Sequence, residues 1–265
     1  MVSFISRIRK VSLVMNVYID LEATQFGREI ISFGAVAENG AEFYTLVRPK
    51  HLNKITKFIT KLTGLTPEMY SDDTPNIDIV ANQFMEWCRE QTDEKLRFFS
   101  FGNFDKVLFD AEFERYPDNK VLERLSKKLS NLCVVIGKVL YHSTSTPGLK
   151  KVYEEVVGKE IEQTHNALDD AKMLMEIHKH IIDTPIEEII SFEEEYLVYK
   201  YVKKWRKKRD KNKALRKYLN SLCDLEIEQL QFKDIKKYVG TEYIESRIRE
   251  DYFNLTGKNW SDNYV

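Results

Sequence analysis

The sequence has little cysteine, no long apolar run and almost no net charge. Its three cysteines, Cys88, Cys133 and Cys223, are far apart and form no C-x-x-C pair. This spacing argues against a zinc site or a disulfide framework and is typical of a reducing, cytoplasmic setting. No apolar run approaches the roughly 20 residues that a membrane-spanning helix needs, so we expect no membrane partner.

The balance of charge and hydrophobicity excludes two further classes of protein. The chain has 41 Lys and Arg against 42 Asp and Glu, so the molecule as a whole has no obvious attraction to nucleic acid. Hydrophobic residues make up 43% and aromatics 12%, which excludes a disordered chain. A length of 265 residues predicts one ordinary domain with an addition, or two small domains.

Patterns of apolar residues predict an α/β fold with a mixed five-stranded sheet flanked by helices. The run 14–19 is rich in β-branched and aromatic residues, which favours a strand. Asn39-Gly40 predicts a hairpin between the next two strands. The other predicted strands are 29–37, 41–48, 96–100 and 131–136, and the predicted helices are 77–88, 105–116, 120–129, 149–157 and 171–182.

Composition divides the chain into three parts. Met15 directly precedes the first strand, so residues 1–14 are predicted to be an N-terminal extension that the fold does not need, with Met15 as an alternative start. Residues 15–183 are predicted to form the main domain, and Pro185 marks its boundary. Residues 184–265 are predicted to be a charged, mainly helical C-terminal extension.

Two carboxylates follow the first strand. Side chains of a strand alternate between its faces, so Asp20 and Glu22 point the same way. Neighbouring carboxylates repel each other unless a cation lies between them, and oxygen ligands of this kind suit Mg²⁺ or Mn²⁺. Alone, this pair is weak evidence for a metal site.

Two more acids and one histidine occupy comparable positions. Asp105 follows the predicted strand 96–100 at the start of a helix, and Asp170 lies near the start of a later helix. His165 and Asp170 would point about 140° apart on one continuous helix, so we expect His165 on the preceding loop. Four acids suffice for two divalent cations spaced for phosphodiester cleavage, and a histidine can accept a proton from water at neutral pH.

Three motifs resemble those of a known family. D-L-E-A-T at 20–24, S-F-G-N-F-D at 100–105 and H-N-A-L-D-D at 165–170 resemble, in this order, the motifs of the DEDDh (DnaQ-like, RNase T-like) 3′→5′ exonucleases. The resemblance covers about residues 15–183 and implies an RNase H-like fold. It implies that Asp20, Glu22, Asp105 and Asp170 bind two Mg²⁺ or Mn²⁺ ions.

The same resemblance assigns the remaining roles. It implies that His165 is the general base and contacts substrate, that Glu22 also takes part in catalysis, and that Ala23 and Thr24 contact the terminal nucleotide. The expected partner is a single-stranded 3′ end. D-x-E-A-T is similar to the enhanced-RNAi and KapD-like branch, which acts mainly on RNA, so RNA is slightly favoured. Phe101 and Phe104 depart from the usual Trp and Tyr, but neither bears a metal ligand.

The sequence is also compatible with two other functions. The enzyme could instead trim DNA ends, in proofreading or repair, or the chain could be a non-catalytic nucleic-acid-binding adaptor on a nuclease fold. The retention of four mutually repelling carboxylates argues against the adaptor. His178 and His180 are two residues apart on a predicted helix, so they should face different ways and lie at the surface.

The C-terminal extension carries its charge in blocks. The segment Glu187–Glu195 has five acids and no base, whereas Lys200–Lys217 has eleven Lys or Arg and one acid. Aromatic residues lie among these bases, a combination that suits single-stranded nucleic acid. A protein partner, or a solvated helix neutralised by the acidic segment, explains the same pattern equally well.

Overall fold

The computed structural model describes residues 14–162, 165–209, 211–239 and 242–256. The predicted extension at 1–14 therefore lies outside the described residues except for Val14. The chain divides into two compact units, one of residues 1–132 and 147–178, the other of residues 133–146 and 179–265. Among the described helices, none is long and apolar enough to cross a membrane.

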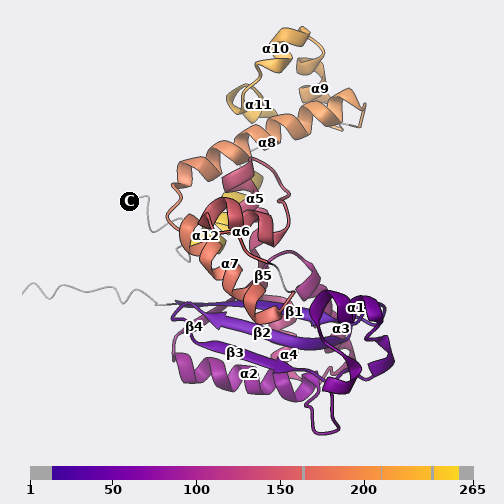
Figure 1. The fold of residues 1–265 in the computed structure, drawn as a ribbon. Coiled ribbons are helices and arrows are strands. Elements are labelled where there is room, and N and C mark those ends of the chain that lie inside the picture. Colours follow the sequence, from indigo (N-terminus) through magenta and orange to yellow (C-terminus); the bar gives the residue numbers. More distant parts are fainter. Residues whose placement is uncertain (1–13, 163–164, 210, 240–241, 257–265) are drawn as a thin grey trace, which may run out of the picture. The chain divides into compact units, whose positions relative to one another are not determined.

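The first unit is built on a mixed five-stranded sheet, as the sequence predicts (Figure 1). The strand order is β3-β2-β1-β4-β5. The first three strands pair antiparallel, whereas β4 is parallel to both β1 and β5. The strands are β1 (Val14–Ala23), β2 (Ile30–Ala37), β3 (Glu42–Leu46), β4 (Lys95–Ser100) and β5 (Leu129–Asn131).

Helices surround this sheet. The core on one sheet face includes Val17, Ile19 and Leu21 of β1, together with apolar residues of α2, α3 and α4. Tyr18, Asp20 and Glu22 alternate with these residues, so they point to the opposite face. The helical segments of this unit are η1 (Leu52–Lys54), α1 (Lys57–Thr63), η2 (Pro67–Met69), α2 (Ile77–Gln91), α3 (Phe104–Arg115), α4 (Lys120–Lys128), α6 (Leu149–Val157) and the larger part of α7 (Ala167–Ile181).

The prediction of a strand over 131–136 is wrong. The fifth strand is the short β5, and residues from Leu132 onward form the helix α5 (Leu132–Tyr141). Leu132, Val135 and Ile136 are buried, at the i, i+3, i+4 spacing of one helix face. A short apolar run fits a buried strand or a buried helix equally well, and here the run is long enough to complete helical turns.

The second unit is helical in its described residues. Its helices include α5 from Cys133 onward, and the long α8 (Ile186–Arg206) contains the acidic segment and the start of the basic one. Lys138 of α5 is buried, with its Nζ 2.5 Å from Oε1 of Glu193 and also in contact with Asp251. The other helices are α9 (Lys213–Leu219), α10 (Asp224–Glu228), α11 (Phe232–Val239) and α12 (Glu242–Thr256).

Candidate active site

Two of the predicted site residues lie in β1 itself. In the antiparallel ladder with β2, Asp20 is opposite Gly34 and Glu22 is opposite Ser32. The register shifts directly after Glu22, between that residue and Ala23. Such a bulge bends the end of a strand and re-aims the side chains beside it. Asp20 and Glu22 therefore share one face of the sheet at an irregular strand end.

Asp105 reaches the same place from the first turn of α3. Its side chain is buried, and its Oδ1 accepts a hydrogen bond of 3.0 Å from the backbone N–H of Leu21. Leu21 lies between Asp20 and Glu22 in the chain, so this bond holds the Asp105 carboxylate beside both. A position in the first helical turn also favours a carboxylate, because the helix dipole is positive there.

The loop before Asp105 is held by Asn131, which the sequence analysis did not single out. The N–H of Gly102, a residue with a φ of 102°, donates a 2.9 Å hydrogen bond to Oδ1 of Asn131. The side-chain amide of Asn131 in turn donates to Oδ1 of Asn103 at 3.0 Å. Asn131 is the last residue of β5, which pairs parallel with β4. The pairing of these two strands therefore fixes the position of the loop before Asp105.

His165 and Asp170 come from the start of α7. His165 precedes the helix, as expected, and has a φ of 47°. Oδ1 of Asn166 accepts hydrogen bonds from the N–H groups of Leu168 and Asp169, so Asn166 acts as the helix N-cap. This cap explains why α7 begins at Ala167, four residues before the predicted start at Ala171.

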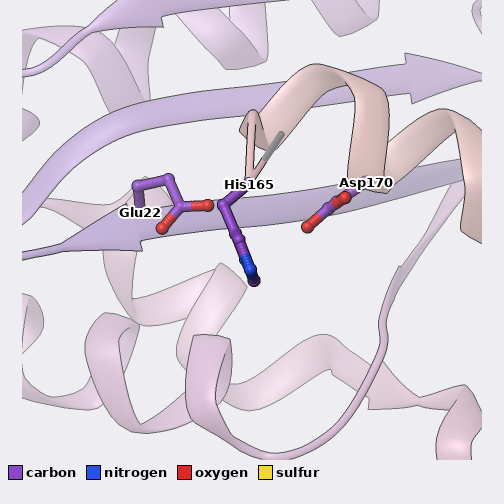
Figure 2. A group of neighbouring side chains, drawn as sticks. All are labelled: Glu22, His165 and Asp170. Atoms are coloured by element: carbon purple, nitrogen blue, oxygen red, sulfur yellow. The ribbon is translucent and has the colours of Figure 1, made fainter. Parts of the chain in front are cut away.

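The structure brings three of these side chains into one group. A ligand atom of Glu22, one of His165 and one of Asp170 all lie within 4.8 Å of one another. Figure 2 shows the three side chains, with Glu22 and Asp170 on either side of His165 in the view drawn. Asp20 and Asp105 are not members of that group of three, but burial and the charge of Asp170 raise the pKa of both.

Helix α7 is tied to β1 by His178, for which the sequence prediction is wrong. We expected His178 at the surface, but it is fully buried, and its Nδ1 lies 2.8 Å from the hydroxyl of Tyr18. The prediction failed because spacing along a helix says which residues share a face but not which face is covered. His180 is exposed, as expected.

The four carboxylates strongly perturb one another. Burial raises the pKa of Asp20 well above its ordinary value, and the charges of Asp105, Asp170 and Glu22 raise it further. Burial, with Asp170 and Asp105, raises the pKa of Glu22 to about 8. Burial also raises the pKa of Asp105 to about 7, although hydrogen bonds from its own N–H and that of Leu21 oppose the shift.

This carboxylate group fits a divalent cation. Within the described residues, neither Asp20 nor Glu22 forms an ion pair with a Lys or Arg. Carboxylates that are crowded, partly desolvated and unneutralised are held together most readily by a bound metal ion. Their oxygen donors suit Mg²⁺ or Mn²⁺.

Ala23 and Thr24, the predicted nucleotide contacts, follow immediately. Both are buried. The hydroxyl of Thr24 accepts a hydrogen bond of 3.2 Å from the N–H of Glu29, and the N–H of Thr24 donates to the carbonyl of Glu29 at 2.9 Å. The loop after β1 is thereby closed on itself beside Glu22.

Known proteins share sequence similarity with this chain. A model of the RNase_T family, described as exonuclease, matches residues 17–178. DNA polymerase III PolC-type of Clostridium perfringens is 32% identical over 207 residues, which are 71% of this chain but only 13% of that protein. ERI1 exoribonuclease 2 of Danio rerio is 34% identical over 80 residues, or 28% of this chain and 14% of that protein.

Solved structures share the fold of a large part of this chain. The nuclease domain of 3′hExo, a DEDDh family member bound to rAMP, has a TM-score of 0.55 and 23% identity and covers 63% of this chain and 91% of its own. A 3′-exonuclease described in the 3′-end specific recognition of a histone mRNA stem-loop has a TM-score of 0.54 and 22% identity. It covers 63% of each chain.

Proposed function

The chain belongs to the RNase_T exonuclease family, and from this premise we propose that it is a DEDDh enzyme that removes nucleotides from the 3′ end of a nucleic acid strand. The observation that carries the proposal is the group of carboxylates at the end of β1, where ligand atoms of Glu22, His165 and Asp170 lie within 4.8 Å of one another. The pKa values of Asp20, Glu22 and Asp105 are all raised there. A group that only stabilised the fold would gain nothing from this repulsion. A phosphodiesterase gains a place for cations.

We assign Asp20, Glu22, Asp105 and Asp170 to two divalent cations, Mg²⁺ or Mn²⁺. When bound, such a pair of ions lowers the pKa of a water and neutralises charge on the leaving oxygen. The chain supplies the rest of the site from rigid elements. Asp20 and Glu22 are fixed by β1, and Asp105 by its hydrogen bond to the Leu21 amide.

His165 is assigned as the general base. It lies on the loop before α7 with a ring nitrogen close to both Glu22 and Asp170. A neutral imidazole can accept the proton that an attacking water loses. The φ of 47° shows that this backbone is held in a conformation unusual for residues other than glycine. Ala23 and Thr24 would border the terminal nucleotide.

We propose RNA as the preferred substrate, acted on as a single strand. The motif D-L-E-A-T, with Ala23 after Glu22, resembles the motif of the enhanced-RNAi and KapD-like branch, which acts mainly on RNA. The similarity to ERI1 exoribonuclease 2 also favours RNA. A DNA-directed enzyme is the second candidate, because the longer match is to DNA polymerase III PolC-type. Both candidates use the same site and differ in the sugar accepted next to it.

One assay tests the proposal and separates the candidates. Matched RNA and DNA 20-mers, each single- or double-stranded, carry a label at the 5′ end and are incubated with Mg²⁺ or Mn²⁺. A 3′→5′ exonuclease shortens the labelled strand in single-nucleotide steps, and blocking the 3′ hydroxyl with phosphate slows it. Internal cleavage, or no metal-dependent cleavage of any substrate, would refute the proposal. Faster loss of DNA than of RNA would select the second candidate.

A further inference from the structure

The C-terminal end of α8, which carries Arg206, lies far along the helix from the acidic segment at its start. Acids occupy the first half of α8 and bases its end, an arrangement that the helix dipole favours. Glu193 is bound instead by Lys138 and Arg247. At 1.5 Å per residue, Glu195, the last acid of that segment, and Arg206 are about 16 Å apart along the axis, about twice the Debye length of about 8 Å at physiological salt.

A pocket lies where α8 and α9 meet. It has a volume of about 490 Å³, and its lining within the described residues is Trp205, Arg206, Lys208, Arg216 and Asn220, none of which is acidic. The indole N–H of Trp205 donates a 2.7 Å hydrogen bond to Oδ1 of Asn220, the residue that caps the C-terminus of α9. This bond fixes the orientation of the indole ring among the basic side chains that line the pocket.

The cations of this pocket face solvent. Arg206, Lys208 and Arg216 are exposed, and within the described part of the chain none of them forms an ion pair with a carboxylate. Lys208 has a φ of 54°, a left-handed conformation that disfavours residues with a Cβ, and its N–H closes a turn onto the carbonyl of Trp205 at 2.8 Å. Three exposed positive charges around one aromatic ring are therefore available to bind an anion.

We propose that this pocket is a second nucleic-acid site, which holds one nucleotide of a single strand with its base stacked on Trp205 and its flanking phosphates on Arg206, Lys208 and Arg216. Its volume lies within the roughly 300–1,000 Å³ of small-ligand pockets. Stacking on an aromatic ring beside a basic track is the general means of holding single strands without reading their sequence. An acidic peptide would match the cations but leave the indole face unused.

Binding is measured without catalysis, so failure here is separate from failure of the proposed nuclease activity. Fluorescence anisotropy follows a labelled oligo(U) or oligo(dT) 20-mer on the full chain in EDTA across a salt series. The variant is Arg206→Gln/Lys208→Gln/Arg216→Gln. The matched control, Arg89→Gln/Lys95→Gln/Lys128→Gln, removes three exposed positive charges outside the pocket and outside the carboxylate group.

The pocket variant should raise Kd at least about 30-fold at 50 mM salt. It should also reduce the slope of log Kd against log salt concentration by about 2, because each of the three lost phosphate contacts releases roughly 0.7 counterions. Its rate on a dinucleotide should match that of the unaltered chain. The control should change Kd less than about threefold. Equal effects of variant and control would overturn the proposal, as would competition by a poly-glutamate 20-mer as strong as that by oligo(U).

Trp205 is tested by two substitutions. Trp205→Phe keeps a ring for stacking, so its Kd should stay within about threefold of the unaltered chain, whereas Trp205→Ala should raise Kd at least about tenfold. Circular dichroism shows whether either variant alters the helices. Stacking should also quench tryptophan fluorescence when oligo(U) binds, and Trp205→Phe should lose that quenching. Unchanged affinity of a folded Trp205→Ala would overturn the stacking role.

Discussion

Gly34 of β2 lies directly against Ala167 at the start of α7: a Cβ built on Gly34 would lie 2.2 Å from the carbonyl carbon of Ala167. Real Cβ atoms essentially never come that close to backbone. Gly34 is also the partner of Asp20 in the β1–β2 ladder. The missing side chain therefore lets the helix that carries Asp170 approach the strand that carries Asp20.

Gly34→Ala should push the start of α7 away from the sheet. We expect loss of nuclease activity of at least about tenfold, a lower Tm and weaker Mn²⁺ binding by calorimetry, because His165 and Asp170 move with the helix. Gly148→Ala is the control, since that glycine has an ordinary φ of −60° and no atom within 4 Å of its added Cβ. Equal activity of the two variants would contradict this positioning role.

Removing a carboxylate of β1 should abolish hydrolysis without unfolding the protein. Asp20→Ala or Glu22→Ala should lower the rate at least about 100-fold, as expected for a key catalytic group. The Tm of the metal-free protein should stay equal or rise, because repulsion among the four carboxylates is relieved. Asp118→Ala, at an exposed position, is the control. More than a tenth of the original rate in either variant would refute the metal assignment.

Adjacent acids in α7 should behave differently. Asp170 is buried in the group with Glu22 and His165, whereas Asp169 is exposed. Asp170→Asn should be inactive, and Asp169→Asn should keep most of the rate. Single-turnover assays with saturating Mg²⁺ make the comparison, and each protein serves as the control for the other. The opposite order would mean that Asp169 is the ligand.

The metal-free protein should lose stability as pH rises. The folded-state pKa of Glu22 is about 8 and that of Asp105 about 7, both above the ordinary values of unfolded carboxylates. The folded state therefore binds more protons than the unfolded state between about pH 4 and pH 8, and stability falls across that interval. In EDTA, Tm should be lower at pH 8 than at pH 6.

Divalent cations should reverse this pH effect. Mn²⁺ or Mg²⁺ binds ionised carboxylates, so it should raise Tm more at pH 8 than at pH 6. Asp20→Asn/Glu22→Gln is the control and should show a flatter pH dependence and little response to metal. Scanning calorimetry at fixed ionic strength measures both. A Tm in EDTA that increases from pH 6 to pH 8 would contradict the crowding of these carboxylates.

In the second unit, Lys138 should be essential for stability. It is 1% exposed and contacts Glu193 and Asp251, and burial raises the pKa of Asp251 despite that lysine. Lys138→Met leaves buried acids without their shared partner and should cost about 3–5 kcal/mol. Urea unfolding followed by circular dichroism measures the loss. Lys236→Met, at an exposed position, should cost less than about 0.5 kcal/mol; similar losses would refute the role.

Local sequence determined most of the sheet and the candidate ligands. The β-branched run before Asp20 and the Asn39-Gly40 turn set strand and hairpin, because these preferences act between near neighbours. The helix α6 ends at Gly158, with a φ of 73°, as its glycine predicts. The motifs containing Asp20, Asp105 and His165 needed no tertiary information to be found.

Only the tertiary structure decided what depends on distant segments. Whether 132–136 is strand or helix, and whether His178 is covered, is settled by what packs against these residues. Gly34 matters because α7 crosses β2 at that point, and Asn131 because β5 ends beside the loop before Asp105. Charge pattern identified the basic segment, but its pocket exists because α9 folds back beside Trp205, a long-range contact that periodicity does not encode.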